Sequence, residues 1–257
     1  MSHPDLTRRK FFVHSAHKTI GVSVSLTAMQ ACDMAEGFAA EDKPAVARHV
    51  CLVSGSPLYK SDDSLAAFQK YLEKSGLAKC SRAFRKSDTE LPGLGNLEAC
   101  DCAIFFTRRS KIAGESLQRV QKFCRSGKGI VGLRTASHGF QEWLAMDKEV
   151  FGGDYQGHYG KEPVEVKIVA AAKDHPILKG VEPFTSKGSL YKNPSIAKDT
   201  TVLLTGTIPG NTHPVAWTRT QHNARVFYTS LGAPEDFETP GFLRLLANAV
   251  AWAGGAL

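Results

Sequence analysis

Short apolar runs alternate with amphipathic segments through the first half of the chain. Residues 112–124 repeat apolar positions at Leu117, Val120 and Phe123, which is the spacing of one helix face. Residues 65–72 show the same spacing. Because buried strands that alternate with helices are typical of a doubly wound sheet, this half predicts parallel strands. The predicted strands are residues 50–53, 80–84, 102–106 and 130–133.

The pattern changes in the second half. Residues 164–170 alternate between apolar and polar positions, as in a strand with one exposed face. A final helix begins at Thr239-Pro240, where proline suits the first helical turn. Three further strands separated by turn residues predict an antiparallel meander, within a single α/β domain. These strands are residues 201–204, 215–218 and 226–231.

The N-terminal segment differs from the rest of the chain. Residues 7–12 read Thr-Arg-Arg-Lys-Phe-Phe, which resembles the core of a twin-arginine export signal. The apolar run at residues 20–31 is too short for a bilayer, which needs ~20 apolar residues. Small residues near 37–40 offer a cleavage point. Residues 1–40 are therefore predicted to be a signal peptide and linker.

This leader implies passage through the twin-arginine translocase. It predicts a periplasmic or secreted protein with no stable membrane insertion once the leader is removed. Two alternatives stay open: an ordinary helix that begins with two arginines, and lipid attachment at Cys32.

Charge and cysteine content narrow the class of protein. The 257 residues carry a formal charge of +7, but the Lys and Arg residues are scattered and no aromatic-and-basic groove motif accompanies them. Nucleic acid is therefore not an expected partner. The cysteines beyond Cys32 show no CxxC spacing, and several lie within apolar runs, which favours buried free thiols.

Polar side chains directly follow the predicted strand 130–133. Arg134, Ser137 and His138 come where this strand ends, and parallel sheets bind ligands outside the carboxyl ends of their strands. Arginine cannot attack a substrate, but its planar guanidinium binds carboxylates, phosphates or sugar oxygens. His138 can transfer protons near neutral pH or bind a metal. A Ser137–His138 pair is disfavoured, because adjacent residues seldom orient for mutual proton transfer and no G-x-S-x-G motif is present.

A glycine-rich loop in the middle of the chain adds further candidates. Together with His138, Asp154 and His158 have the ligand types of a zinc site or a similar divalent-metal site. Tyr155 and Tyr159 supply aromatic surface, on which the C–H faces of sugars can stack. The alternative is that Asp154 and His158 only organise the loop, with the carboxylate accepting backbone N–H groups.

The second half contributes two more candidates. Tyr191 is expected to line a pocket wall. Asp236 follows the last predicted strand and is a candidate acid–base partner of His138. His175 directly precedes Pro176, where capping of a turn is a simpler explanation than a functional role.

Five segments carry a family resemblance: residues 129–133, 151–158, 175–177, 214–218 and 225–232. Together they resemble the ThuA-like family, named for trehalose utilisation, over most of residues 48–255. The resemblance implies the fold of class I glutamine amidotransferases, a flavodoxin-like three-layer α/β/α sandwich. Its sheet would be mostly parallel with a C-terminal antiparallel meander. The resemblance also implies a role in disaccharide metabolism, including that of oxidised sugars.

The chain departs from the family pattern at two positions. Many members carry histidine directly after the fourth strand, where this chain has Arg134. Many also read Gly-His after the last strand, where this chain has Gly232-Ala233. In amidotransferases the first position holds a cysteine nucleophile. Arg134 therefore argues against thiol chemistry, and Ala233 leaves open a binding role without catalysis.

The leading hypothesis is an exported carbohydrate-processing enzyme that acts on a glycoside or keto-sugar by His/Asp acid–base or metal-assisted chemistry. The alternatives are a non-catalytic sugar-binding module and a family member with only a structural or interaction role. The enzymatic hypothesis requires Arg134, His138 and His158 to converge at one edge of the sheet. The predicted catalytic residues are His138, His158 and Asp236; the predicted substrate-binding residues are Arg134, Tyr155, Tyr159 and Tyr191; a divalent metal such as zinc would be held by His138, Asp154 and His158.

Overall fold

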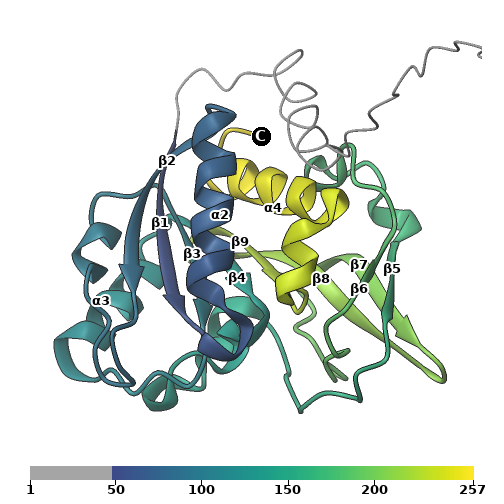
Figure 1. The fold of residues 1–257 in the computed structure, drawn as a ribbon, viewed down its shortest axis with the longest axis horizontal. Helices are drawn as coiled ribbons and strands as arrows, with labels where there is room; N and C mark the ends of the chain where they lie inside the picture. The colour runs from purple at the N-terminus through teal and green to yellow at the C-terminus, as the bar shows by residue number, and fades with distance from the viewer. Residues whose placement is uncertain (1–47) are drawn as a thin grey trace, which may run out of the picture.

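Within residues 48–257, nine strands form one continuous sheet in the order β2-β1-β3-β4-β9-β8-β7-β5-β6 (Figure 1). The computed structural model describes residues 48–257, so the predicted leader at residues 1–40 lies outside the described residues. The strands are β1 (Arg48–Gly55), β2 (Ala78–Phe84), β3 (Cys102–Thr107), β4 (Gly129–Leu133), β5 (Val164–Ile168), β6 (Phe184–Ser186), β7 (Thr201–Ile208), β8 (Asn211–Gln221) and β9 (Ala224–Thr229). The longer helices are α2 (Ser61–Lys74), α3 (Gly114–Cys124) and α4 (Pro240–Ala253).

The parallel half of the sheet consists of β2, β1, β3, β4 and β9. Its central strands are apolar along most of their length because both of their faces are covered. Leu52 of β1, Ile104 of β3 and Val131 of β4 are all fully buried. The four strands predicted from apolar runs are therefore confirmed, as is their parallel pairing.

The antiparallel half continues from β9 through β8, β7, β5 and β6. The sheet has four parallel and four antiparallel strand pairs, so the prediction of a mostly parallel sheet was wrong. The reason is that β5 and β6 join the sheet beside β7 and form no crossover unit. A strand with one exposed face suits antiparallel pairing, and β5 exposes Glu165 and Lys167. The predicted C-terminal meander is confirmed in β7, β8 and β9.

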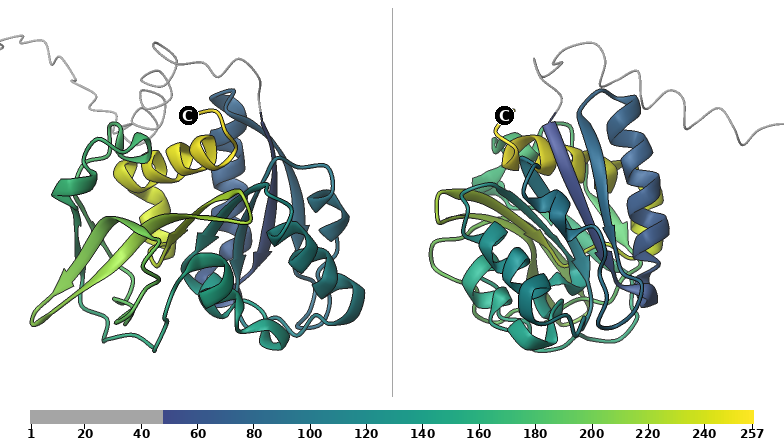
Figure 2. Two further views of the ribbon diagram at one scale, coloured as in Figure 1. Left: turned by 180° about the vertical axis from the view of Figure 1, so that it is seen from behind. Right: turned by 90° about the vertical axis from the view of Figure 1, so that its left-hand side faces the viewer.

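Helices lie on both faces of the parallel half. α2 and α4 lie in front of the sheet in Figure 1, and α3 lies on the opposite face with several short helices, as the reverse view in Figure 2 shows. Two apolar clusters fill the spaces between these helices and the sheet. The arrangement therefore has three layers over the parallel strands, whereas β5 leaves one face to solvent. No helix within residues 48–257 is long and apolar enough to cross a membrane.

Two smaller predictions are also confirmed. The cysteines of the described residues are free thiols, and all except Cys80 are buried. His175 caps the short helix at Pro176–Leu178, because its Nδ1 accepts a hydrogen bond from the Ile177 backbone N–H at 3.2 Å. Neither the cysteines nor His175 is therefore assigned a catalytic role.

Candidate functional site

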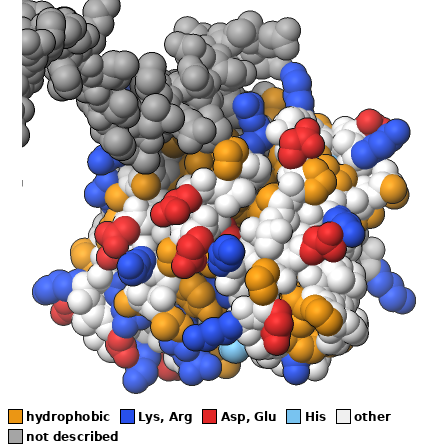
Figure 3. Space-filling view, turned by 45° about the vertical axis from the view of Figure 1, so that its right-hand side comes forward, with side chains coloured by type: hydrophobic (Ala, Val, Ile, Leu, Met, Phe, Trp, Pro, Cys, Tyr) orange, Lys and Arg blue, Asp and Glu red, His pale blue; other side chains and the backbone are white. Residues whose placement is uncertain are grey.

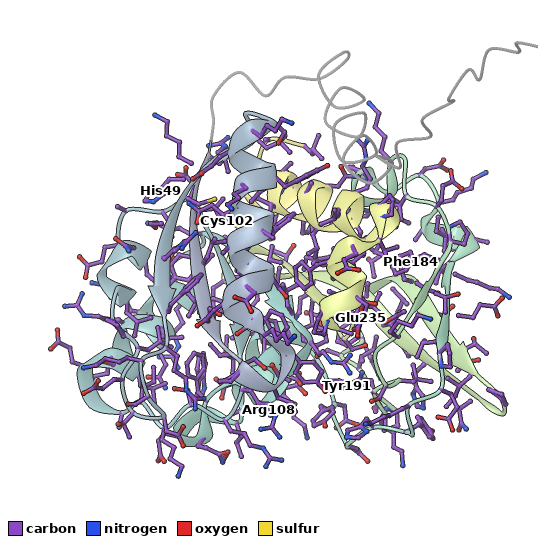
Figure 4. All side chains as sticks on the ribbon, viewed as in Figure 1. His49, Cys102, Arg108, Phe184, Tyr191 and Glu235 are labelled. Atoms are coloured by element: carbon purple, nitrogen blue, oxygen red, sulfur yellow. The ribbon has the colours of Figure 1, made fainter. Side chains whose placement is uncertain are left out.

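The candidate site lies at the carboxyl ends of β3 and β4. A main-chain hydrogen bond joins the segments that follow these strands, since the Arg109 N–H donates to the His138 carbonyl at 2.9 Å. Figure 4 shows Arg108 and Tyr191 at this same end of the sheet. Strand ends of a parallel sheet meet at one edge, and a third segment, around Tyr191, reaches that edge from the antiparallel half.

Arg134 occupies the sharp turn directly after β4. Its φ of +46° lies in the left-handed region, and the Tyr228 hydroxyl donates to its carbonyl at 2.7 Å. The guanidinium lies 4.5 and 4.9 Å from the ring centroids of Tyr59 and Tyr191, and it donates to the Ser230 carbonyl at 2.8 Å. Arg134 is only 1% exposed, so it supports the site from the interior. Its contact with substrate stays a prediction.

His138 lies one short helical turn beyond β4. Its ring stacks on Tyr155 at 4.5 Å between centroids, and its Nδ1 lies 3.1 Å from the Ser137 hydroxyl. This contact between neighbours, which the sequence disfavoured, does form. Burial, followed by the positive charges of Arg108 and Arg109, lowers the pKa of His138 to about 4. His138 is therefore a neutral imidazole at pH 7 and can accept a proton.

His158 reaches the same edge from the glycine-rich loop, where an antiparallel bridge pairs it with Tyr191. The rings of His138, Tyr155, Tyr191 and His158 form a continuous row, with successive centroids 4.5, 4.5 and 6.4 Å apart. We call these four residues the aromatic row. The charge of His158 also lowers the pKa of His138. The structure thus brings together the two histidines on which the enzymatic hypothesis depends.

Asp147 is a site residue that the sequence analysis missed. It is 6% exposed, and its Oδ2 accepts a hydrogen bond from the Tyr155 backbone N–H at 2.9 Å. Among the described residues its buried Oδ1 has no hydrogen-bond partner, and burial raises the pKa of Asp147 to about 6. A side chain at Gly153 would collide with this carboxylate. The adjacent Gly152-Gly153 pair was the signal that could have pointed to a buried group here.

A pocket of about 580 Å³ opens beside the aromatic row. This volume falls in the range of sites for small molecules. Its lining includes Arg109, Ser137, His138, Asp147, Asp154 and Tyr155. The pocket therefore offers donors, acceptors and an aromatic face to one small polar ligand.

The predicted metal ligands are not arranged as a metal site. Within residues 48–257, no group of three or more His, Cys, Asp and Glu side chains is placed to hold a metal ion. Asp154 accepts a hydrogen bond from the Gln156 side chain at 2.9 Å, and His158 Nδ1 donates to the Tyr159 carbonyl at 2.7 Å. These local bonds agree with the alternative that Asp154 and His158 organise the loop.

Of the predicted site residues, only His138, Asp154 and Tyr155 line this pocket; Arg134, His158, Tyr159, Tyr191 and Asp236 do not. Asp236 is fully buried, and its Oδ2 accepts bonds from the Gly232 and Ala233 backbone N–H groups at 2.8 and 2.9 Å. These bonds fix the loop that follows β9. The Tyr159 hydroxyl lies 3.0 Å from His213 Nε2, on β8. The structure therefore gives Asp236 and Tyr159 local partners away from His138.

These features define a class: α/β proteins with a mixed sheet and a polar pocket with an aromatic wall at the carboxyl edge of the parallel strands. Within this class, the chain belongs to the ThuA family, described as trehalose utilisation, whose model matches residues 50–253.

Solved structures share this fold at low sequence identity. A ThuA-like protein of Parabacteroides merdae is 17% identical with a TM-score of 0.65, over 81% of this chain and 90% of that protein. A ThuA-like protein of Bacteroides uniformis is also 17% identical with a TM-score of 0.65, over 83% of this chain and 94% of that protein. No curated protein matches the chain. Such likeness establishes a fold, so function is argued from this chain's own residues.

Proposed function

We propose that the pocket binds a small carbohydrate and processes it by acid–base chemistry, with His138 as the base. The observation that carries this proposal is the neutral ring of His138 stacked on Tyr155 at the wall of the pocket. The flat face of an aromatic ring suits the C–H surface of a sugar, and the charged groups beside it suit the hydroxyls. Membership of a family named for trehalose utilisation supports the same class of ligand.

The chemistry assigned to the site is proton transfer on a glycoside or keto-sugar. Neutral His138 takes a proton from a sugar hydroxyl or from the carbon beside a carbonyl group. His158, at the opposite end of the aromatic row from the pocket-lining His138, donates from Nδ1 to the Tyr159 carbonyl, which leaves its Nε2 available as an acceptor. Asp147, with its raised pKa, keeps a proton at mildly acidic pH and is the candidate proton donor of the pocket.

Replacing His138 by glutamine tests the proposal, since glutamine keeps polar atoms but cannot take up a proton at neutral pH. Turnover of a glycoside and keto-sugar panel, followed by chromatography, should fall at least about 100-fold. Sugar affinity measured by calorimetry should change less than about threefold, because the base acts mainly in the transition state. His175→Gln, at a helix cap away from the pocket, is the matched control. Unchanged turnover in His138→Gln would remove His138 from the mechanism.

The pH profile gives a second readout of the same role. Wild-type activity should be lost as the pH falls through about 4, where His138 becomes protonated and can no longer act as a base. An acid limb that lies at the ordinary pKa of histidine would contradict the assignment.

A non-catalytic sugar-binding module is the second candidate. Ala233 stands where many family members carry histidine, and Asp236 has its oxygens bonded within the loop after β9. A binding module would retain sugar in calorimetry but form no product after prolonged incubation. Ala233→His is a direct probe, because a gain of turnover in this variant would show that the native pocket lacks a catalytic group.

We also propose export through the twin-arginine route to the periplasm or the exterior. The support is the Thr-Arg-Arg-Lys-Phe-Phe sequence at residues 7–12, which lie outside the described residues. Exchange of Arg8 and Arg9 for lysine should retain the protein in the cytoplasmic fraction of a bacterial host. Lys18→Arg is the control. Equal export of the double variant and wild type would contradict this route.

A further inference from the structure

We infer that the ligand of this pocket carries a carboxylate or phosphate group, which the side chains of Arg108 and Arg109 bind. The inference rests on the proposed function, because it names the class of saccharide that the same pocket would take. A sugar acid or a sugar phosphate carries such a group and is expected to bind more tightly than a neutral saccharide.

Two main-chain hydrogen bonds hold residues 108–110, which follow β3, beside His138. We call these residues the arginine segment. The Arg109 N–H donates to the His138 carbonyl at 2.9 Å, and the Ser110 N–H donates to the Gly139 carbonyl at 2.8 Å. Because these bonds belong to the backbone, they fix the segment independently of side-chain rotamers. Arg109 lines the pocket, and Arg108 is near enough for its charge to act on His138.

The guanidinium groups of Arg108 and Arg109 have no acidic ion-pair partner among the described residues. Arg134 likewise forms no ion pair within this part of the chain. Two adjacent guanidinium groups without an ion-pair partner repel one another, and a bound anion relieves that repulsion. Elsewhere, Arg85, Arg119 and Arg219 pair with carboxylates. Arg48 and Arg82 have no carboxylate partner within residues 48–257 but donate hydrogen bonds to Gly255 and Gln69.

Backbone conformation sets two of these arginines apart. Arg109 and Arg134 have φ values of +47° and +46°, a region in which residues other than Gly, Asn and Asp are uncommon. Such strain persists where the surrounding structure enforces it, and it clusters at ligand sites. Glycine or asparagine would satisfy the backbone at position 109 equally well. The side chain is therefore the reason for an arginine there.

Two carboxylates, Asp147 and Asp154, line the same pocket as Arg109. Within the described residues, neither forms an ion pair with Arg108 or Arg109, so the two guanidinium groups remain available to a ligand. Besides burial, the positive charges of Arg108, Arg109 and Arg134 lower the pKa of His138. Figure 3 shows Lys and Arg side chains gathered beside a histidine along the lower edge of the molecule.

The size of the pocket restricts the anion to a small molecule. A volume of about 580 Å³ suits a monosaccharide or disaccharide. The remaining Lys and Arg residues are scattered along the chain and give no basic track for a polymer. The anionic group and the sugar ring are thus expected in one ligand, with the ring on the aromatic row and the charge on the arginines.

Calorimetric titration of the purified protein with four probes tests this inference: methyl glucoside, glucuronate, glucose 6-phosphate and inorganic phosphate. We expect glucuronate or glucose 6-phosphate to bind at least about tenfold more tightly than methyl glucoside, because charged hydrogen bonds to arginine are strong. The preference should weaken as salt is added. The order of the two acidic sugars distinguishes a carboxylate ligand from a phosphate ligand.

Two substitutions locate the preference in the arginine segment. Arg109→Asn removes the charge with a residue that tolerates positive φ, and Arg108→Gln removes the neighbouring charge. Each should reduce the preference for acidic sugars at least about fivefold, while methyl glucoside affinity changes less than about twofold. Arg119→Gln removes one charge from α3 and should leave the preference unchanged.

The remaining possible outcomes of these titrations contradict the inference in different ways. Equal affinity of the wild type for charged and neutral sugars overturns it, as does a preference that survives both substitutions in variants with wild-type unfolding temperature. The proposed carbohydrate site would then stand alone. Inorganic phosphate that binds as tightly as glucose 6-phosphate overturns the saccharide assignment. Failure of every sugar to bind overturns the proposed function as well.

Discussion

The parallel half of the sheet supplies several residues that line the pocket, whereas the antiparallel half supplies an exposed sheet face. The parallel half is covered on both faces, and its strand ends supply Arg109, Ser137 and His138 to the pocket. The antiparallel half exposes one face of β5 and contributes the Tyr191 segment, whose buried ring packs against the pocket-lining Tyr155. Parallel strands end together at one edge, whereas adjacent antiparallel strands end at opposite edges. The pocket therefore lies at the edge where the parallel strands end together.

The largest expected difference between the halves concerns the core. Phe105 on β3 is fully buried, with its ring centroid 6.1 Å from that of Phe123 and 6.4 Å from that of Phe140. Phe105→Ala should lower the free energy of unfolding by about 3–5 kcal/mol, because it leaves a cavity in a tightly packed cluster. Phe184→Ala on the edge strand β6, where the ring is partly exposed, should cost less than half as much. Equal losses in denaturant titrations would remove the contrast.

Asp147 allows a comparison of charge burial in the two halves. The folded-state pKa of Asp147 is raised from 3.8 to about 6, so ionisation disfavours the folded protein. Stability should therefore fall as the pH rises from about 4 to 6, by about 3 kcal/mol in total. Asp147→Asn removes this penalty, and its gain over wild type should be larger at pH 7 than at pH 4.

The control for Asp147 is Asp199, an exposed carboxylate of the antiparallel half that pairs with Arg219 at 2.7 Å. Asp199→Asn should change stability by less than about 1 kcal/mol at pH 7, because the Asp199 carboxylate is exposed and Arg219 keeps its bonds to the Lys148 and Glu149 carbonyls. Unfolding titrations of both variants at two pH values give the answer. A gain in Asp147→Asn that does not depend on pH would contradict the burial argument.

Substitution of Tyr155 and of Tyr159, which lie in one loop, should affect sugar affinity differently. Tyr155 stacks on His138 and lines the pocket, so Tyr155→Ala should weaken sugar binding about tenfold. Tyr159 contacts His213 of the antiparallel half, so Tyr159→Phe should leave affinity within about twofold. Calorimetry with methyl glucoside measures both, and a similar loss in the two variants would place the ligand elsewhere.

The smallest expected effect lies on the open face of β5. Lys167 is exposed there, and Lys167→Ala should change the free energy of unfolding by no more than about 0.5 kcal/mol. A larger loss, measured by thermal unfolding, would indicate that another surface covers this face.

The predictability of the fold also differs between the halves. Buried apolar runs identified β1, β3 and β4, because such strands need no partner-specific signal. β6 was missed since Phe184–Ser186 is too short to show a period. The pairing of β5 was not evident because alternation reveals an exposed face but not which strand lies alongside. Pairing is decided by contacts between distant segments.

Contacts between distant segments also limited the prediction of the site. The approach of His138 and His158 could be predicted, since each follows a recognisable segment at the carboxyl edge. Burial of Arg134 could not be, because the covering rings of Tyr59 and Tyr191 come from distant parts of the chain. Asp147 was missed because its partner is the Tyr155 backbone N–H, which carries no sequence signature.

The main-chain bond from Arg109 to His138 makes the two strand ends mechanically one unit. Replacing the loop after β3 would therefore also move the His138 ring. Ligand preference and reaction rate would then change together. Engineers wishing to retune this protein would therefore do better to change single side chains and keep the loop backbones intact.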